Sequence, residues 1–287
     1  MAGLARSAKS ADAIEAAGCR PYSADALDRS EVIAVAKAFA PEVIVNQLTA
    51  LGPKPDTSKF DQAFATTNRL RTEGGQNLIA AGRAVRARRY VAQSFCGWPY
   101  AREGGEIKDE HDPLDPNPPG GYRRTLQAIR QLEEDVASLS DMEGVTLRYG
   151  NFYGPGTVFA SDGSFVDDLR RRRIPLVGRA CGVFSFAHVE DVASATALAI
   201  EGAPTGIFNV VDDDPAPVRE WLPFLADVVG AKAPIRMPSW VMRLLMPKHL
   251  YIMMTEIRGG SNKRFKDAFG WKPTYCSWRQ GFVDALG

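Results

Sequence analysis

Hydrophobic residues in the first half of the chain alternate between two spacings. Residues 2–7, 42–48 and 88–95 are predicted as strands, and the apolar run at 42–48 is typical of a buried one. Residues 8–18 and 60–82 carry apolar positions three or four apart, which predicts helices. Strands joined through helices by short connections predict an α/β fold, with a doubly wound parallel sheet and helices on both of its faces.

The stretch 145–156, VTLRYGNFYGPG, joins a short predicted strand to a tight Gly-Pro-Gly turn. In open α/β sheets, ligands bind just beyond the carboxyl ends of the strands. Arg148, Asn151 and Tyr153 are therefore candidates for contact with a ligand. The same pattern is also compatible with a buried strand that is followed by an ordinary turn.

Changes in composition divide the chain. Residues 97–121 are dense in proline, glycine and acidic residues, which predicts a long surface loop. After the Gly-Pro-Gly turn the alternation loosens, and we expect a smaller carboxyl-terminal cap assembled from several pieces. The predicted dinucleotide-binding domain covers 1–155 and includes 184–211, and the predicted cap covers 156–183 and 212–287.

The composition narrows the class of partner. A chain of 287 residues with 45% hydrophobic residues can bury a large core, and its net charge of +1 gives no overall attraction to nucleic acid or to an anionic membrane. The four cysteines are isolated and have no metal-binding spacing. We expect a cytoplasmic protein that binds a small-molecule substrate and no metal. A homodimer is compatible with the sequence.

Five segments resemble, in order, motifs of the extended short-chain dehydrogenase/reductases, the family of NAD-dependent epimerases and dehydratases. They are TEGGQNLIAAGRAVRARRYVAQS (72–94), VTLRYGNFYGPG (145–156), FSFAHVEDVASA (184–195), FNVVDDDPAPVREW (208–221) and FGWKPTYCSWRQGF (269–282). The resemblance implies a Rossmann-type sheet with a cap, and an enzyme that moves a hydride to or from a nicotinamide cofactor.

The resemblance also implies a set of cofactor-binding residues at the ends of strands and in the turns that follow. By position these are Arg6, Ser7, Asp25, Ala26, Gln47, Leu48, Thr49, Tyr149, Gly150 and Asn151. A cation at the end of the second family strand accommodates a 2′-phosphate, so Arg6 favours NADP over NAD. Arg6 could equally be a solvated residue at the end of a strand.

The family's glycine-rich loop is not found in this sequence. Counting from the usual position of the ribose contact, the strand and loop that hold the pyrophosphate would precede Met1 by roughly 20 residues. Either the sequence is a piece of a longer protein or begins at a late start site, or the chain has lost the cofactor. The first explanation is favoured, because loss of a central strand leaves two rows of backbone groups unpaired.

The family's catalytic YxxxK pair is also altered. Tyr122 is the tyrosine nearest the expected helix, but Leu126 stands where the lysine would be. A register through Glu133 instead places Thr125 and Ile129 at the two positions. We predict Ser94 and Tyr122 as catalytic residues.

The predicted substrate contacts are Phe95, Tyr153 and Phe184. Phe184 stands where nucleotide-sugar enzymes of the family carry an arginine for the diphosphate, which favours a smaller or more apolar substrate. We therefore expect an NAD(P)-dependent oxidoreductase or epimerase acting on a small carbonyl, hydroxyl or sugar-like substrate. The alternative is a catalytically degenerate nucleotide-binding sensor or scaffold of the same fold.

Overall fold

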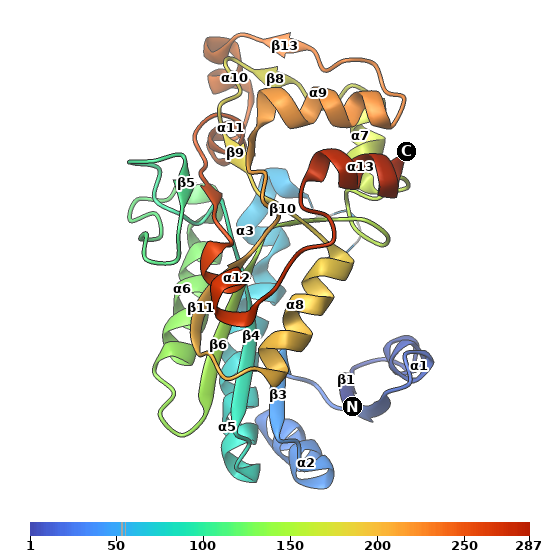
Figure 1. Cartoon of the computed structure of the whole chain (residues 1–287), viewed down its shortest axis with the longest axis vertical. Helices are drawn as coiled ribbons and strands as arrows, with labels where there is room; N and C mark the ends of the chain where they lie inside the picture. The colour runs from blue at the N-terminus through green and yellow to red at the C-terminus, as the bar shows by residue number, and fades with distance from the viewer. Residues whose placement is uncertain (53, 55) are drawn as a thin grey trace.

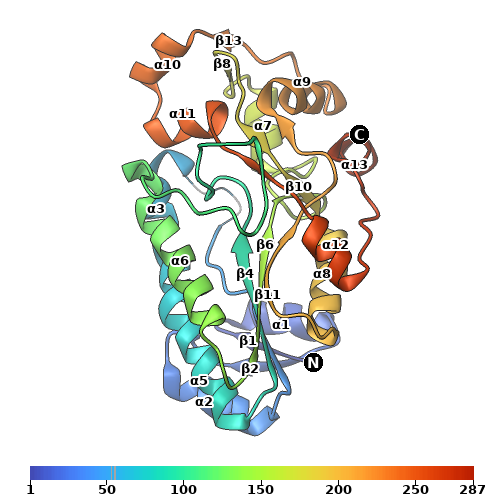
Figure 2. The ribbon, with the colours of Figure 1, turned by 60° about the vertical axis from the view of Figure 1, so that its left-hand side comes forward.

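A four-stranded parallel sheet forms the centre of the computed structural model, which describes residues 1–52, 54 and 56–287. Its strand order is β11-β6-β4-β3. The strands are β3 (Val43–Asn46), β4 (Arg89–Phe95), β6 (Glu143–Tyr149) and β11 (Gly206–Val210). All of them point toward the cap, as Figure 2 shows for β4 and β6.

Helices cover both faces of this sheet (Figure 2), so the predicted α/β fold with a parallel Rossmann-type sheet is confirmed. One layer consists of α2 (Arg29–Phe39), α5 (Gly75–Val85) and α6 (Arg123–Ala137), and the other of α8 (Val189–Glu201) and α12 (Lys263–Phe269). Side chains alternate between the layers as a pleated strand requires. On β4, Tyr90 and Ala92 pack toward the first layer and Val91 toward the second. Helix α12 joins the second layer through Phe265, although it lies in the stretch predicted for the cap.

The first two strands form a separate sheet. Strands β1 (Ala2–Ala5) and β2 (Arg20–Ser23) pair in parallel, and α1 (Ala8–Ala16) connects them. Among the described residues β3 pairs only with β4, so the edges of β1 and β3 both lack a neighbour. Helix α1 has no buried residue, and the pair is set apart at the lower right of Figure 1. The sequence predicted this gap as the place of a central strand.

The segment between β3 and β4 differs from the single long helix expected over residues 60–82. It consists of the short 3-10 helix η1 (Thr57–Lys59), α3 (Phe60–Ala63), α4 (Ala65–Arg69), the π-helical turn η2 (Leu70–Gly74) and α5. The first break falls at Phe64, whose ψ of 2° is not helical. The π turn leads into the pair Gly74 and Gly75, and glycine is a weak helix former.

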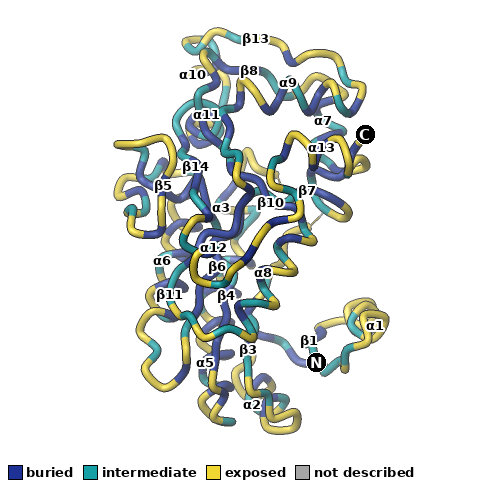
Figure 3. Tube along the Cα trace, in the orientation of Figure 1, coloured by how far each residue is buried: buried dark blue, intermediate teal, exposed yellow. Residues whose placement is uncertain are grey.

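The cap lies at the carboxyl ends of the strands. Its elements are α7 (Ser164–Arg170), β8 (Leu176–Val177), β9 (Val183–Phe184), β10 (Phe186–His188), β12 (Ala216–Pro217), α9 (Val218–Val228), β13 (Arg236–Met237), α10 (Ser239–Leu245), α11 (Lys248–Thr255) and α13 (Trp278–Leu286). Trp221, Trp278 and Phe282 form the centre of its hydrophobic core. Burial therefore concentrates in the central sheet and in the cap, as the dark segments of Figure 3 show.

Four further elements connect the sheet and the cap. Strand β7 (Asn151–Tyr153) follows β6 and pairs with β10. The loop predicted over 97–121 contains β5 (Ile107–Lys108), which pairs with β14 (Gly259–Gly260), and ends in the 3-10 helix η3 (Gly120–Tyr122). No helix in the described part of the chain is long and apolar enough to cross a membrane.

Candidate functional site

The ends of β3 and β6 are linked by hydrogen bonds at the edge of the sheet that faces the cap. Nε2 of Gln47 donates to the hydroxyl of Tyr149 at 3.0 Å, and that hydroxyl lies 2.7 Å from Oγ1 of Thr196 on α8. Gln47 and Thr49 are exposed, while Leu48 is half-buried. The structure therefore brings together Tyr149 and the three predicted cofactor residues that follow β3.

The turn after β2 approaches the same place from the separate sheet. Nδ2 of Asn77 on α5 donates to the carbonyl of Ala26 at 3.0 Å. A Cβ atom built on Gly74 would lie 3.1 Å from Leu48 and 3.6 Å from the Ala26 carbonyl oxygen. Ala26 and Leu48, which the sequence placed in one binding site, are thus neighbours across the first turn of α5.

Two of the three other predicted contacts near the amino terminus, Ser7 and Asp25, make local hydrogen bonds. Arg6 is exposed at the end of β1. Oγ of Ser7 accepts the N–H of Ser10 at 3.2 Å and caps α1. The carboxylate of Asp25 accepts the N–H of Leu27 at 3.0 Å. Of these three side chains, only that of Arg6 is left without such a local bond among the described residues.

Gly150 and Asn151 connect β6 to the cap. A Cβ atom at Gly150 would lie 2.8 Å from the carbonyl oxygen of Ser185 and 2.9 Å from Val211, so a larger residue does not fit. Asn151 donates to the same Ser185 carbonyl from its backbone N–H and from Nδ2, at 2.8 and 3.1 Å. The link between β6 and β7 therefore fixes the sheet against β10.

A buried ionic network lies directly below this edge. Oε1 of Glu133 accepts from Oγ of Ser94 at 2.6 Å and from Nε of Arg148 at 2.8 Å, while Oε2 accepts from Nη2 of Arg148 at 2.6 Å. Nη1 of Arg148 donates to the hydroxyl of Tyr100, which donates to Asn209. Arg148, a sequence candidate for ligand contact, is thus bound inside the protein.

The ion pair determines the protonation state of the network. Burial alone would lower the pKa of Arg148, but its hydrogen bonds to Glu133 outweigh this effect and raise the pKa. Arg148 therefore stays charged at every accessible pH. Ser94 is 2% exposed, and its hydroxyl already donates to a carboxylate. This geometry gives Ser94 a structural bond, and its catalytic role stays a prediction.

Tyr122 lies in an aromatic cluster between α6 and the cap. Its ring centroid is 4.7 Å from that of Trp98 and 6.2 Å from that of Phe60. Its hydroxyl is sealed from solvent and has no hydrogen-bond partner among the described residues. Burial raises the pKa of this hydroxyl, so Tyr122 stays protonated at neutral pH. Its catalytic role also stays a prediction.

The three predicted substrate contacts lie in two places. Phe95 and Phe184 are half-buried, and both pack against the aromatic cluster that holds Trp98 and Tyr122. Tyr153 is fully buried in the core of the cap, where its ring packs against Phe282 at 5.2 Å. Phe184 also packs against that core, with its ring 4.9 Å from that of Trp221, so it lies between Phe95 and Tyr153.

Sequence reasoning missed a polar chain at the start of α6. Oγ1 of Thr125 donates to Asp61 at 2.7 Å and accepts from Nδ2 of Asn68 at 3.0 Å. Oδ1 of Asn68 in turn accepts from Nη1 of Arg71 at 3.3 Å. The register through Glu133 already placed Thr125 at the tyrosine position, and that was the one signal in the sequence pointing here.

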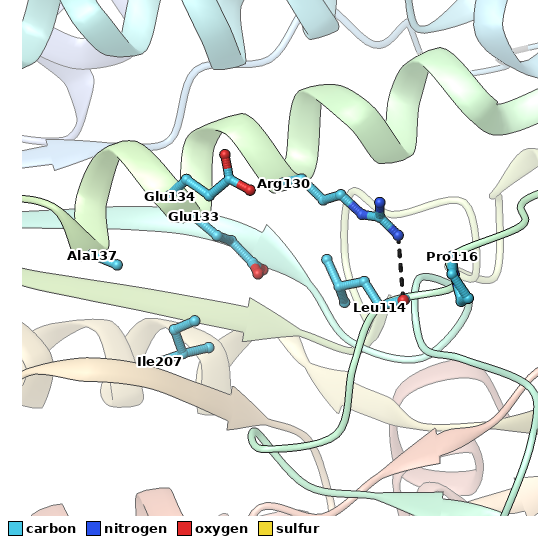
Figure 4. Close-up of a pocket in the computed structure, with 7 residues that line it drawn as sticks. All are labelled: Leu114, Pro116, Arg130, Glu133, Glu134, Ala137 and Ile207. Atoms are coloured by element: carbon cyan, nitrogen blue, oxygen red, sulfur yellow. Dashed lines mark hydrogen bonds between the residues drawn. The ribbon is translucent and has the colours of Figure 1, made fainter.

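Two surface hollows are present, and the first of them borders the ionic network through Glu133. One, of about 490 Å³, lies along α6 and is lined by Leu114, Arg130 and Glu134 among others (Figure 4). Within it, Nη2 of Arg130 donates to the Leu114 carbonyl at 3.3 Å. The other, of about 730 Å³, lies between β5 and α12.

The residues that the structure describes include no cluster of three or more His, Cys, Asp or Glu suited to a metal ion.

Comparisons with known proteins agree with this architecture. A family model described as "NAD dependent epimerase/dehydratase family" matches residues 1–210. A protein of Streptomyces sp named 3-diazoavenalumate denitrifying reductase is 43% identical over 263 residues, which are 91% of this chain and 85% of that protein.

Solved structures extend the likeness to the whole fold. The UDP-glucose 4-epimerase of Thermus thermophilus, in complex with NAD, matches with a TM-score of 0.68 at 22% identity and covers 96% of this chain and 92% of its own. The UDP-glucose 4-epimerase of Thermotoga maritima, with UDP-glucose, matches with a TM-score of 0.72 at 18% identity and covers 93% and 83%. At these identities the likeness establishes a shared fold.

Proposed function

Because this chain belongs to the NAD dependent epimerase/dehydratase family and is an NAD-dependent enzyme, we propose that it is a reductase for aromatic diazo compounds. The main observation that supports this proposal is which residues occupy the tyrosine and lysine positions of the YxxxK pair on α6. The register through Glu133 gives Thr125 and Ile129 there, and Thr125 is bound to Asp61. Glu133, on which this register is aligned, accepts from both Ser94 and Arg148.

A diazo substrate suits such a site because its reduction needs no proton donor. A reduced nicotinamide, when bound, would supply a hydride, and the electron pair of that hydride would form a C–H bond at the ring carbon of an arenediazonium ion. The C–N bond breaks, and its pair leaves with N2. The balance is ArN2⁺ + NAD(P)H → ArH + N2 + NAD(P)⁺. Reduction of a carbonyl would instead require a proton at the oxygen.

The chain's own contribution is to bind and to exclude water. Gln47, Leu48 and Thr49 lie at the carboxyl end of β3, with the hydroxyl of Tyr149 bonded to Gln47, and they would line the dinucleotide. Phe95 and the aromatic cluster behind it would hold an aryl ring away from water. The exposed guanidinium of Arg6 has no local partner among the described residues and would hold the 2′-phosphate of NADP, which we propose as the preferred cofactor over NAD.

Isotope transfer tests this proposal directly. The full chain is incubated with 4-carboxybenzenediazonium and NADPH carrying deuterium at C4, with an enzyme-free control for spontaneous reduction. We expect loss of absorbance at 340 nm, release of N2, and deuterium at the ring carbon that carried nitrogen. Oxidation of NADPH without deuterium in the ring would exclude hydride delivery to that carbon.

The Tyr122→Phe variant separates this reaction from one that requires a proton. We expect its turnover to stay within about threefold of the parent, because no step uses the phenol. A loss of about 100-fold or more would restore Tyr122 as a proton donor. A panel of ketones and nucleotide sugars completes the assay, and turnover of those alone would replace the diazo proposal.

The alternative function, a nucleotide-binding sensor, rests on the same altered YxxxK positions. It predicts binding of NADPH without turnover of any substrate in the panel. Fluorescence of bound NADPH measures that outcome in the same samples.

A further inference from the structure

Arg71 is a buried cation without a counter-ion among the described residues. It lies on the π turn η2, is 9% exposed, and makes one hydrogen bond within that part of the chain, from Nη1 to Oδ1 of Asn68 at 3.3 Å. Its Cζ lies 5.9 Å from the centre of the Phe64 ring. Burial lowers the pKa of this guanidinium to about 10, so it remains charged at neutral pH.

The other buried arginines show how unusual this arrangement is within the described part of the chain. Arg148 is paired with Glu133, and Arg89 is paired with Glu143 and donates to two backbone carbonyls. A buried charge without such a partner is destabilising. Proteins retain costly groups of this kind mainly where they serve function.

The carboxylate closest along this polar chain does not neutralise Arg71. Asp61 accepts from the backbone N–H groups of Arg124 and Thr125 and from the hydroxyl of Thr125, so it caps α6. Asn68 stands between that hydroxyl and Arg71, and its amide orientation is fixed by donating to Thr125. The remaining N–H groups of Arg71 are thus left for another acceptor.

The helical stretch that carries Arg71 lies beside the proposed cofactor segment. Arg71 is 9% exposed, so its side chain keeps a small contact with solvent. On the same helical stretch, Oγ1 of Thr67 accepts the N–H of Ala50 at 3.1 Å, which ties this stretch to the end of β3. A π turn inserts one residue into a helix and often marks a functional site.

We propose that Arg71 binds an anionic oxygen, a carboxylate or a phenolate, of an aromatic substrate. The ring of Phe64 lies beside the guanidinium and, with its stacked neighbour Phe60, belongs to the aromatic cluster that also holds Phe95. A planar aryl anion can therefore meet a cation and apolar rings in one place. This inference deepens the proposed diazo reduction and rests on it for the nature of the substrate.

Binding of unreactive probes tests Arg71 without relying on turnover. Calorimetry in the presence of NADPH compares 4-hydroxycinnamate, a carboxylate, with 4-nitrophenolate and with the neutral methyl ester of 4-hydroxycinnamate. For Arg71→Gln we expect about 10- to 100-fold weaker binding of at least one anion, and less than about threefold change for the ester. The anion that loses affinity identifies the group that Arg71 binds.

Two further variants complete the design. Arg69→Gln, two residues away, removes an exposed guanidinium paired with Glu73 and should leave all three affinities unchanged. Arg71→Lys keeps the charge but loses the planar fork, so intermediate affinity is expected, and this variant serves if Arg71→Gln fails to fold. Equal losses for the ester and the anions, or no loss for either anion, would overturn the inference.

The unfolding temperature distinguishes a binding role of Arg71 from a structural one, because the two roles predict changes of opposite sign. Arg71→Met removes the uncompensated charge and keeps much of the volume, so the ligand-free variant should unfold at a higher temperature than the parent. A lower temperature would mean that Arg71 supports the fold. If anion binding depends on Arg71 but no diazo compound is reduced, the proposed function fails while the anion site stands.

Discussion

Removing one partner of the buried pair formed by Glu133 and Arg148 should destabilise the protein strongly. The two side chains are 6% and 4% exposed and share two hydrogen bonds of 2.8 and 2.6 Å. In Arg148→Met, the carboxylate of Glu133 stays buried and keeps only the hydroxyl of Ser94 as a partner among the described side chains. The variant therefore tests whether this network holds α6 against the sheet.

The structure sets the size of the expected effect. Breaking a buried pair from one side costs about 3–5 kcal/mol, because the remaining charge is uncompensated. Ser94→Ala removes one bond to a charged acceptor and should cost about 1.5–3 kcal/mol. The double variant Glu133→Leu with Arg148→Met leaves no charge behind, so its cost should be well below the sum of the two single changes.

Urea unfolding followed by tryptophan fluorescence measures these differences. Arg83→Met is the matched control, because Arg83 pairs with Asp141 at 2.8 Å but the two side chains are 53% and 46% exposed. An exposed pair contributes about 0–1 kcal/mol. If Arg148→Met costs no more than this control, or if the two single effects simply add, the pair does not support the fold as the structure indicates.

Three further predictions concern the turn after β6, the cap and the first sheet. Gly150→Ala should cost about 2 kcal/mol or more and lower the melting temperature, because its Cβ would lie 2.8 Å from the Ser185 carbonyl oxygen; an unchanged melting temperature would contradict this close approach. Burial raises the pKa of Asp212 well above its ordinary value of 3.8 despite backbone hydrogen bonds that lower it, so its contribution to stability is present at low pH and is lost as pH rises through the folded-state pKa. Asp212→Asn should remove this decline, which one proton limits to about 1.4 kcal/mol per pH unit, and identical pH profiles of unfolding free energy for parent and variant would refute it. Backbone amides of β1 and β2 should exchange with deuterium much faster than those of β4, because two strands alone are marginally stable; equal protection would show that the pair is held as firmly as the sheet.

Much of the fold could be predicted from the sequence because the main strands are apolar runs between clear helices. β4 and β6 were expected from their hydrophobic residues, and both lie in the central sheet. The gap beside β3 followed from the missing glycine loop. The strands and the gap could be predicted because local sequence patterns agree with the folded structure at these positions.

The chemistry of the site depended on contacts that no local pattern records. Ser94 and Arg148 meet through Glu133, which is distant from Ser94 in the sequence and reaches it only once α6 packs on the sheet. Arg71 lies on a π turn, where one inserted residue changes the direction of a side chain and breaks the regular spacing. Both groupings therefore required the relative placement of helix and sheet.

The free edge of β3 has a consequence for handling the protein. Its backbone N–H and C=O groups on that side face no strand among the described residues, and the strand carries the valines and isoleucine of the VIVN run. Such an edge pairs readily with an extended segment of another molecule. Concentrated samples should therefore self-associate through this edge. A peptide that pairs in parallel with β3, added in excess, should compete with that self-association.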